Sequence, residues 1–146
     1  MAMNLIADLI PKLTRDDDKK AFLEGLQRNV ALGWTQIHVP GGTFQDISIL
    51  NEIKSENKLL QRVYFMVSDG EPADLLLEKG PIIDSENLLT VRTIKMYADG
   101  ALGSRGAALI EKYSDYDGKG VFIFREEETK PKLSLIHISE PTRPRL

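Results

Sequence analysis

The sequence contains no cysteine, only two histidines and no long apolar run. Without cysteine the chain has neither disulfides nor thiolate metal ligands. No apolar stretch approaches the roughly 18 residues that a membrane-spanning helix needs. Residues 1–10 also lack the basic segment that opens a secretory signal. We therefore expect a soluble, cytoplasmic protein with no membrane partner.

A basic excess is missing as well. The chain has 22 acidic and 19 basic residues and a formal net charge of -3. This charge balance does not favour binding of a phosphate backbone, so nucleic acid is not an expected partner. The 42% hydrophobic and 28% charged fractions are ordinary for a globular protein, and 146 residues suggest one domain.

Three stretches rich in β-forming residues alternate with helical segments. The predicted strands are residues 34–39, 61–67 and 90–97, and the predicted helices are residues 14–33, 43–57 and 73–79. Capping-box spacings at Thr14 and Thr43 predict the starts of the two longer helices. A helix between successive strands predicts a parallel sheet with helical crossovers. Rossmann-type sheets and (β/α)8 barrels share this rhythm, so periodicity alone leaves both open.

Residues 98–120 form a connection that is long for an α/β fold, which favours a functional loop. Gly100, Gly103 and Gly106 lie in it, directly after the third predicted strand. Their spacing matches neither the dinucleotide fingerprint nor a P-loop. Glycines that permit tight turns are the simpler interpretation, and phosphate binding is the alternative.

Lys95 lies near the carboxyl end of the third predicted strand, which is the active-site end of parallel α/β folds. Strand alternation predicts that Thr93 and Lys95 share one face, with Arg92 and Ile94 on the other. From this pattern alone, a surface lysine whose stem packs on apolar neighbours is the commoner case. A role in a site is the alternative.

His38 ends the first predicted strand and His137 lies near the end of the chain. His38 could act as a metal ligand or an acid–base group, or it could be a hydrogen-bonded core histidine. One histidine does not make a catalytic zinc site, which typically needs about three protein ligands.

Residues 94–109 carry a resemblance to a known family. They read IKMYADGALGSRGAAL, which resembles the central motif of amidohydrolase family 3, the YtcJ-like proteins that include N-substituted formamide deformylases. Residues 32–38 (LGWTQIH) and 111–115 (EKYSD) are similar to the same family. The resemblance covers most of residues 1–128.

The resemblance implies an α/β fold, a partial (β/α)8 TIM barrel made of strands two to four with their crossover helices. It implies a hydrolase of C–N bonds in small amide or formamide substrates, with a divalent metal, zinc, that activates water and polarises the carbonyl. Lys95 matches a fourth-strand lysine that many members of the wider superfamily carboxylate to make a metal ligand. His38 is the weaker metal candidate, because Val39 stands where the family often has Asp.

The resemblance also places a substrate loop at residues 99–106, with Asp99, Gly100, Gly103 and Arg105 as its candidate residues. It implies a histidine pair on an earlier strand and further histidines and an aspartate on later ones, which this sequence lacks. Lys95 alone cannot hold a catalytic metal. We therefore expect residues 1–128 to be part of a barrel domain, with Met1 an internal methionine, and the isolated chain to be inactive.

Residues 133–143 read LSLIHISEPTR and resemble the translation of a sequencing adapter rather than any part of the family. We expect residues 129–146 to be a non-native, disordered tail, so that His137 is no ligand.

Two rival hypotheses remain from the residues. A small non-catalytic α/β module could bind a partner or an anion through the glycine-rich loop, and it predicts a folded, soluble chain. A different barrel enzyme could use the loop for phosphate, with Arg105 as a contact. The enzyme-fragment hypothesis predicts aggregation or a molten state, because three strands cannot close a barrel and leave apolar faces uncovered.

Overall fold

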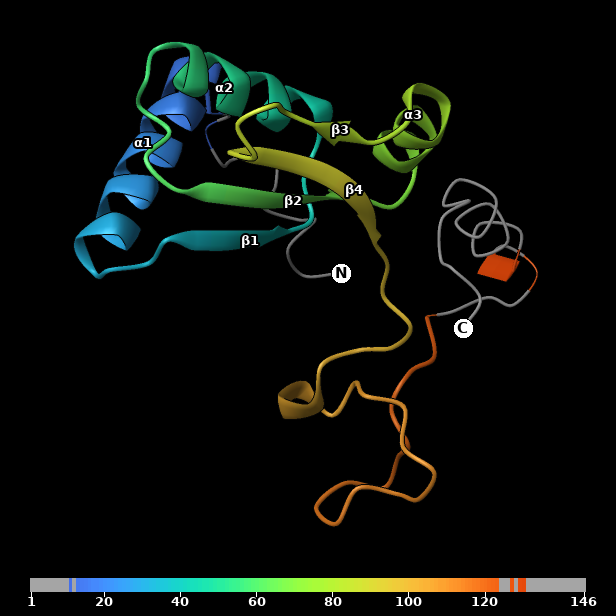
Figure 1. Ribbon diagram of the computed structural model, residues 1–146. Helices are drawn as coiled ribbons and strands as arrows, with labels where there is room; N and C mark the ends of the chain where they lie inside the picture. The colour runs from blue at the N-terminus through green and yellow to red at the C-terminus, as the bar shows by residue number, and fades with distance from the viewer. Residues whose placement is uncertain (1–10, 12, 124–126, 128, 131–146) are drawn as a thin grey trace, which may run out of the picture.

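A computed structural model describes residues 11, 13–123, 127 and 129–130. Its elements follow one another in an α/β order (Figure 1). They are α1 Arg15–Ala31, β1 Gln36–Pro40, α2 Phe44–Ser55, β2 Arg62–Ser68, α3 Glu71–Lys79, β3 Ile82–Ile83, β4 Leu89–Lys95 and the short 3-10 helix η3 Leu102–Ser104. The predicted helices and strands are confirmed to within a few residues, and β3 is an addition.

The strands make one sheet in the order β1-β2-β4-β3. Strand β1 pairs with β2 and β2 with β4, both in parallel, as the helical crossovers predict. The two-residue strand β3 is antiparallel to β4. It is too short for a periodic pattern, and for that reason the sequence does not indicate it.

Both long helices begin with a complete capping box. The hydroxyl of Thr14 accepts the Asp17 backbone N–H while the Asp17 carboxylate accepts the Thr14 N–H, and Thr43 and Asp46 repeat the arrangement. These bonds satisfy backbone donors that have no partner inside the helix. The predicted starts of both helices are thus confirmed.

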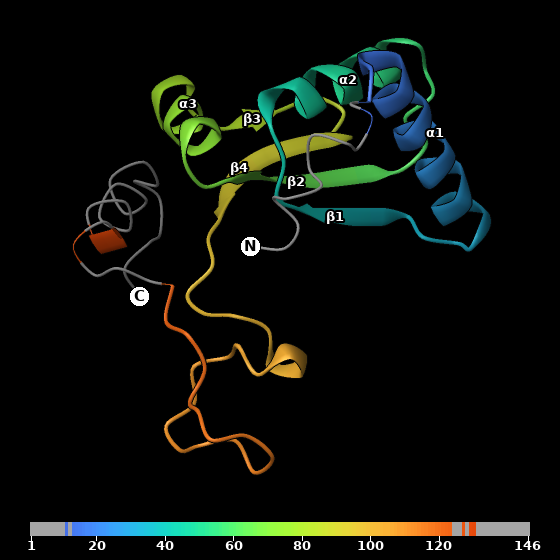
Figure 2. The same cartoon turned by 180° about the vertical axis from the view of Figure 1, so that it is seen from behind.

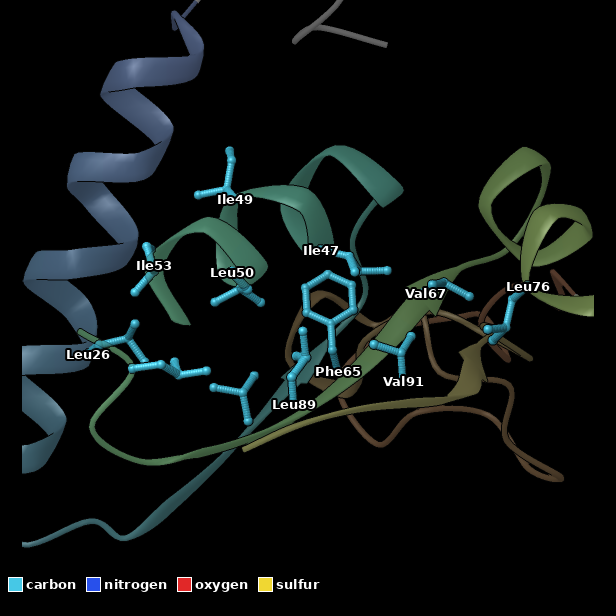
Figure 3. Packing of buried hydrophobic residues seen from close by; sticks show 12 residues of the cluster. Leu26, Ile47, Ile49, Leu50, Ile53, Phe65, Val67, Leu76, Leu89 and Val91 are labelled. Carbon is cyan, nitrogen blue, oxygen red and sulfur yellow. The ribbon is translucent and has the colours of Figure 1, made fainter. Parts of the chain in front are cut away.

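The core lies between the sheet and the helices on one of its faces (Figure 3). Phe65 and Val67 of β2 point toward α2, where Leu50 and Ile53 are fully buried. Burying each such side chain stabilises the fold by about 1.5–3 kcal/mol. Cluster members come from α1, α2, α3, β2, β4 and the segment before β2. They are Leu26, Ile47, Ile49, Leu50, Ile53, Leu59, Val63, Phe65, Val67, Leu76, Leu89 and Val91.

A bulge in β4 corrects the predicted face of Arg92. Phe65 pairs with Val91 but Met66 pairs with Thr93, so Arg92 is an extra residue. The Tyr64 hydroxyl is 2.6 Å from Thr93 Oγ1 and accepts a hydrogen bond from Arg92 Nε at 3.3 Å. Arg92 and Thr93 therefore lie on the same side, where strict alternation would separate them.

The bulge also decides where Lys95 points. Val91 is in the core, so uninterrupted alternation would place Thr93 and Lys95 in the core as well. With Arg92 as the extra residue, Ile94 packs against the core instead. Lys95 pairs with Ser68 on the opposite face of the sheet.

The sheet is open in the described residues, and its strands do not form a closed barrel. After β4, residues 98–123 extend away from the layer formed by the sheet with α1 and α2 (Figures 1 and 2). None of the described helices is both long and apolar enough to cross a bilayer. The tail predicted at residues 129–146 falls, except for residues 129 and 130, outside the described residues.

Candidate functional site at the carboxyl edge of the sheet

Lys95 is the last residue of β4 and lies at the carboxyl edge, where three parallel strands end. Its stem packs over Gly41, since a Cβ built on Gly41 would lie 3.7 Å from Lys95 Cγ and 3.3 Å from Ser68 Oγ. The Lys95 ammonium sits 4.7 Å from the centre of the Tyr97 ring. The predicted position of Lys95 near the carboxyl end of its strand is confirmed.

Backbone hydrogen bonds fasten this edge together. The N–H of Ser68 donates to the Gly42 carbonyl at 2.9 Å, and the N–H of Asp69 donates to the Lys95 carbonyl at 3.2 Å. The ends of β1, β2 and β4 are therefore held in fixed relative positions. A site on strand ends of this kind is more rigid than one on a free loop.

Two adjacent glycines face opposite sides of the sheet at this edge. Gly41 has a φ of 115° and lies beside Ser68 and Lys95 on the open face. Gly42 lies against the Phe65 ring on the core face. The two glycines thus leave room for the lysine stem on one side and for a core aromatic on the other.

His38 lies on the open face rather than in the core. Its ring stacks on Tyr64 with the centroids 5.1 Å apart, and its Nε2 is hydrogen-bonded to the Gln36 side-chain amide at 2.9 Å. The side chain is exposed. The core-histidine interpretation of His38 is wrong, because the odd-numbered residues of β1 are the ones that face the helices.

The structure does not bring His38 and Lys95 together. His38 pairs with Tyr64, whereas Lys95 pairs with Ser68, four residues further along β2. At roughly 3.3 Å per strand residue, the two levels are about 13 Å apart along the strand. His38 is also on β1 and Lys95 on β4, with β2 between them. One metal ion cannot bind both side chains in this arrangement.

The described residues do not fit a complete metal site. Within them, no three His, Asp or Glu side chains gather into a possible metal-binding group. The ammonium of Lys95 has no lone pair to offer until it is modified. The region holds one candidate ligand of the expected metal and lacks the others.

The loop after β4 is an ordered structure of its own. Asp99 is half-buried, and its Oδ2 accepts the Ala108 backbone N–H at 2.9 Å. Asp99 also forms a β-bridge with Phe122, which returns the loop to its starting point. The side chain of Asp99 therefore closes the loop, a role that the sequence does not indicate.

The glycines of the loop are explained by close backbone packing. A Cβ on Gly100 would lie 2.7 Å from the Gly106 carbonyl oxygen. The Gly100 N–H donates to the Gly106 carbonyl, and the Gly106 N–H donates to the Ala101 carbonyl. These donors are already used within the loop, so Gly100 and Gly106 do not offer a phosphate cradle. Around Gly103 the space is open.

Arg105 projects from the turn that follows η3. Its guanidinium donates to Asp115 Oδ2 from Nε at 3.3 Å and from Nη2 at 2.9 Å. It also lies 5.7 Å from the centre of the Tyr116 ring. Arg105 and Asp115 are both largely exposed, at 48% and 63% of their side-chain areas. The partners of Arg105 follow ten or more residues later in the same loop.

A hollow beside the exposed edge of β1 is a second surface feature. It has a volume of about 580 Å³. Its lining comes from α1, β1 and the turn between them: Asn29, Trp34, Gln36, Ile37 and His38. His38 is the one residue among these with an acid–base side chain, so the hollow gathers no set of catalytic groups.

Sequence reasoning missed the polar network of the open face. Tyr64 of β2 connects His38 of β1 with Thr93 and Arg92 of β4. The alternation of β2 carries a signal for it, since Tyr64, Met66 and Ser68 alternate with fully buried apolar residues. The partners on β1 and β4 depend on register, which one sequence does not show.

No protein-family model matches the chain, and no curated protein matches it significantly. Two solved structures share its fold, and both are of uncharacterized metal-dependent hydrolases. That from Pyrococcus horikoshii OT3 has a TM-score of 0.73 and 25% identity over 86% of this chain. That from Pyrococcus furiosus has a TM-score of 0.73 and 24% identity over 92% of this chain.

The chain spans about a quarter of these relatives, 26% of the first and 28% of the second. It therefore has the fold of one part of a metal-dependent hydrolase. The comparisons name no substrate and no metal, and they identify no family.

Proposed function

We propose that the chain is the part of a metal-dependent amidohydrolase that supplies strands two to four of a (β/α)8 barrel. The shared fold with two metal-dependent hydrolases supports this proposal. The observation that carries it is Lys95, which ends a parallel strand at the carboxyl edge with its side chain on the face away from the helices. Active sites of parallel barrels form at that edge.

Lys95 is the proposed metal ligand of this part of the protein. Carboxylation would join the neutral amine to CO2 with release of one proton, which gives the residue anionic oxygen donors. The stem of Lys95 packs beside Gly41, and its ammonium lies over the Tyr97 ring, a contact that the carboxylated side chain would give up. Zinc is the proposed metal, and its remaining ligands are proposed to come from beyond the described residues.

The proposed reaction is hydrolysis of the C–N bond of a small amide or formamide. Residues 99–106 start four residues after Lys95 and are the proposed substrate loop. Hydrogen bonds of Asp99 and Gly100 close the base of this loop, while Gly103 and Arg105 lie in its turn. The isolated chain is proposed to be inactive because its described residues lack the other metal ligands.

Long-read sequencing of the source DNA across this locus tests the proposal first. We call the complete product of that gene, whatever its length, the full-length protein. A frame that extends to a His-x-His strand upstream, and to further histidines and an aspartate beyond residue 128, supports the proposal. A frame that begins at Met1 and ends at Leu146 overturns it and favours a small binding module.

An activity measurement follows on the full-length protein. We expect hydrolysis of formanilide that is lost after treatment with a chelator and restored by zinc. Absence of hydrolysis across neutral and charged amides, in protein that contains metal, contradicts the proposed reaction.

A further inference from the structure

Arg105 has a backbone conformation that its residue type disfavours. Its φ of 58° and ψ of 27° are left-handed. Elsewhere in the described part of the chain, positive φ occurs only at Asn57, Asn87 and glycines. Glycine and asparagine tolerate this region, whereas a long side chain adds strain. Arginine is therefore the exception among the left-handed positions in the described residues.

The turn itself does not need an arginine. The Arg105 N–H donates to the Leu102 carbonyl at 2.9 Å, and the Gly106 N–H donates to the Ala101 carbonyl at 2.9 Å. These are backbone bonds that any residue at position 105 would make. Glycine would make them without strain, so the reason for an arginine lies in its guanidinium group.

The ion pair that Arg105 makes inside the loop does not explain why an arginine stands at this position. The ion pair with Asp115 is exposed on both sides, and such pairs add little to stability. Both guanidinium donors converge on the single oxygen Oδ2 of Asp115. A carboxylate that offers both of its oxygens to the guanidinium makes the stronger contact, with two parallel hydrogen bonds. Asp115 is thus a partner that a carboxylate ligand can replace.

The surroundings of the guanidinium suit a flat anion. Arg105 lies in the loop that leaves the carboxyl edge of the sheet, ten residues beyond Lys95 in the sequence, and its side chain is about half exposed. The ring of Tyr116 lies beside the guanidinium and offers an apolar surface next to the charge. A flat ligand with a carboxylate would meet both groups.

We infer that Arg105 selects substrates that carry a carboxylate, and that Asp115 holds its guanidinium in place until the substrate displaces it. This inference rests on the proposed hydrolase function for its reaction, but the binding step stands on the loop geometry alone. The chemical class of substrate is a formamide or amide with an anionic aromatic or alkyl acid group.

Binding is tested first, without reference to activity. The full-length protein is treated with phenylglyoxal, and labelling of Arg105 is measured by peptide mass spectrometry. We expect para-formamidobenzoate to protect Arg105, and formanilide, which lacks the carboxylate, to leave it reactive. Inorganic phosphate serves as a third probe, because protection by phosphate alone would assign the arginine to a phosphate ligand and overturn the inference.

Two aspartate variants in the loop sharpen this test, one inside the Arg105 ion pair and one outside it. Asp115→Asn removes the internal carboxylate, so it should lower the concentration of para-formamidobenzoate that gives half protection. Asp117→Asn is the matched control, because Asp117 pairs with Lys112 in the same loop and does not contact Arg105. An equal effect of both variants would mean a general charge effect and would contradict displacement of Asp115.

Kinetics then separate the inference from the proposed function. Arg105→Gly suits the left-handed backbone, and its melting temperature should not fall. We expect kcat/KM for para-formamidobenzoate relative to formanilide to fall about tenfold to hundredfold, mainly through KM. An unchanged ratio overturns the role of Arg105 even if formanilide is hydrolysed. If neither compound is hydrolysed but Arg105 is protected, the reaction is wrong and the carboxylate site stands.

Discussion

The ring of Phe65 occupies the space that a side chain at Gly42 would need. A Cβ built on Gly42 would lie 2.3 Å from Phe65 Cζ and 3.1 Å from Cε1. Phe65 is completely buried among residues of the core cluster, so its ring has no free space to enter. The glycine that follows β1 is therefore required by the packing of a residue on β2.

Gly42→Ala should destabilise the full-length protein. Overpacking of a filled core costs about 1–3 kcal/mol, and the melting temperature measured by circular dichroism should fall accordingly. Gly25→Ala is the matched control, because Gly25 lies in α1 with nothing within 4 Å of its built Cβ. That change should stabilise by about 0.5–1 kcal/mol. Equal effects of the two substitutions would contradict the packing argument.

Because of the ion pairs between α1 and the end of α2, the stability of the fold depends on pH in the acid range. Lys19 Nζ lies 2.5 Å from a carboxylate oxygen of Glu52 and 2.5 Å from one of Glu56. Hydrogen bonds from Lys19 and then from Lys58 lower the pKa of Glu56 from 4.5 to about 2. The folded state therefore holds the Glu56 proton less tightly than the unfolded state does.

The direction in which stability changes with pH follows from the difference between the folded-state and unfolded-state pKa of Glu56. A carboxyl group with a lowered folded-state pKa stabilises the fold above its unfolded pKa, and this contribution is lost as the pH falls through the folded value. The melting temperature of the wild type should exceed that of Glu56→Gln near neutral pH. The difference should shrink between about pH 5 and about pH 2. A difference that stays constant over this range would show that the Glu56 charge is not responsible.

Local patterns in the sequence fix most of the fold, and long-range register fixes the rest. Capping boxes at Thr14 and Thr43 and the apolar alternation of β2 depend on residues a few positions apart, so a single sequence reveals them. The bulge at Arg92 depends on how β4 aligns with β2. Strict alternation cannot anticipate an inserted residue, and the predicted face of Arg92 was wrong for that reason. The prediction that Thr93 and Lys95 share one face, with Ile94 on the other, is confirmed.

The candidate site also has features that the sequence predicts and features that depend on how the strands pair. The location of Lys95 follows from its place at a strand end, so the sequence predicts it. The neighbours of Lys95 are Gly41 and Ser68, which only the pairing of the strands brings close to it. The separation of His38 from Lys95 is likewise a matter of register. The roles of Asp99 and Arg105 depend on hydrogen bonds across the loop, and no periodic pattern encodes these.

The bulge at Arg92 can be tested by removing it. Deletion of Arg92 would restore alternation after Val91 and turn Thr93 and Lys95 toward the core. Burying an unpaired ammonium is costly, so the deletion should prevent β4 from pairing as it does now. We expect loss of the cooperative melting transition. Arg92→Ala keeps the extra residue and should melt within a few degrees of the wild type, and if it melts as poorly as the deletion, the side chain rather than the bulge is what matters.

Lys95 provides the last prediction, which concerns the proposed metal site. Lys95→Arg keeps the positive charge and most of the stem but cannot be carboxylated to an oxygen ligand. Because loss of groups that merely support metal ligands already costs about 10- to 100-fold, loss of a ligand should lower kcat/KM for formanilide by at least about 100-fold. Bound zinc, measured by elemental analysis, should fall in parallel. Lys95→Glu places a carboxylate at the same strand end and should recover part of the metal content. If Lys95→Arg retains full zinc and full activity, Lys95 is a surface residue that packs on Tyr97, and the metal site of the full-length protein lies elsewhere.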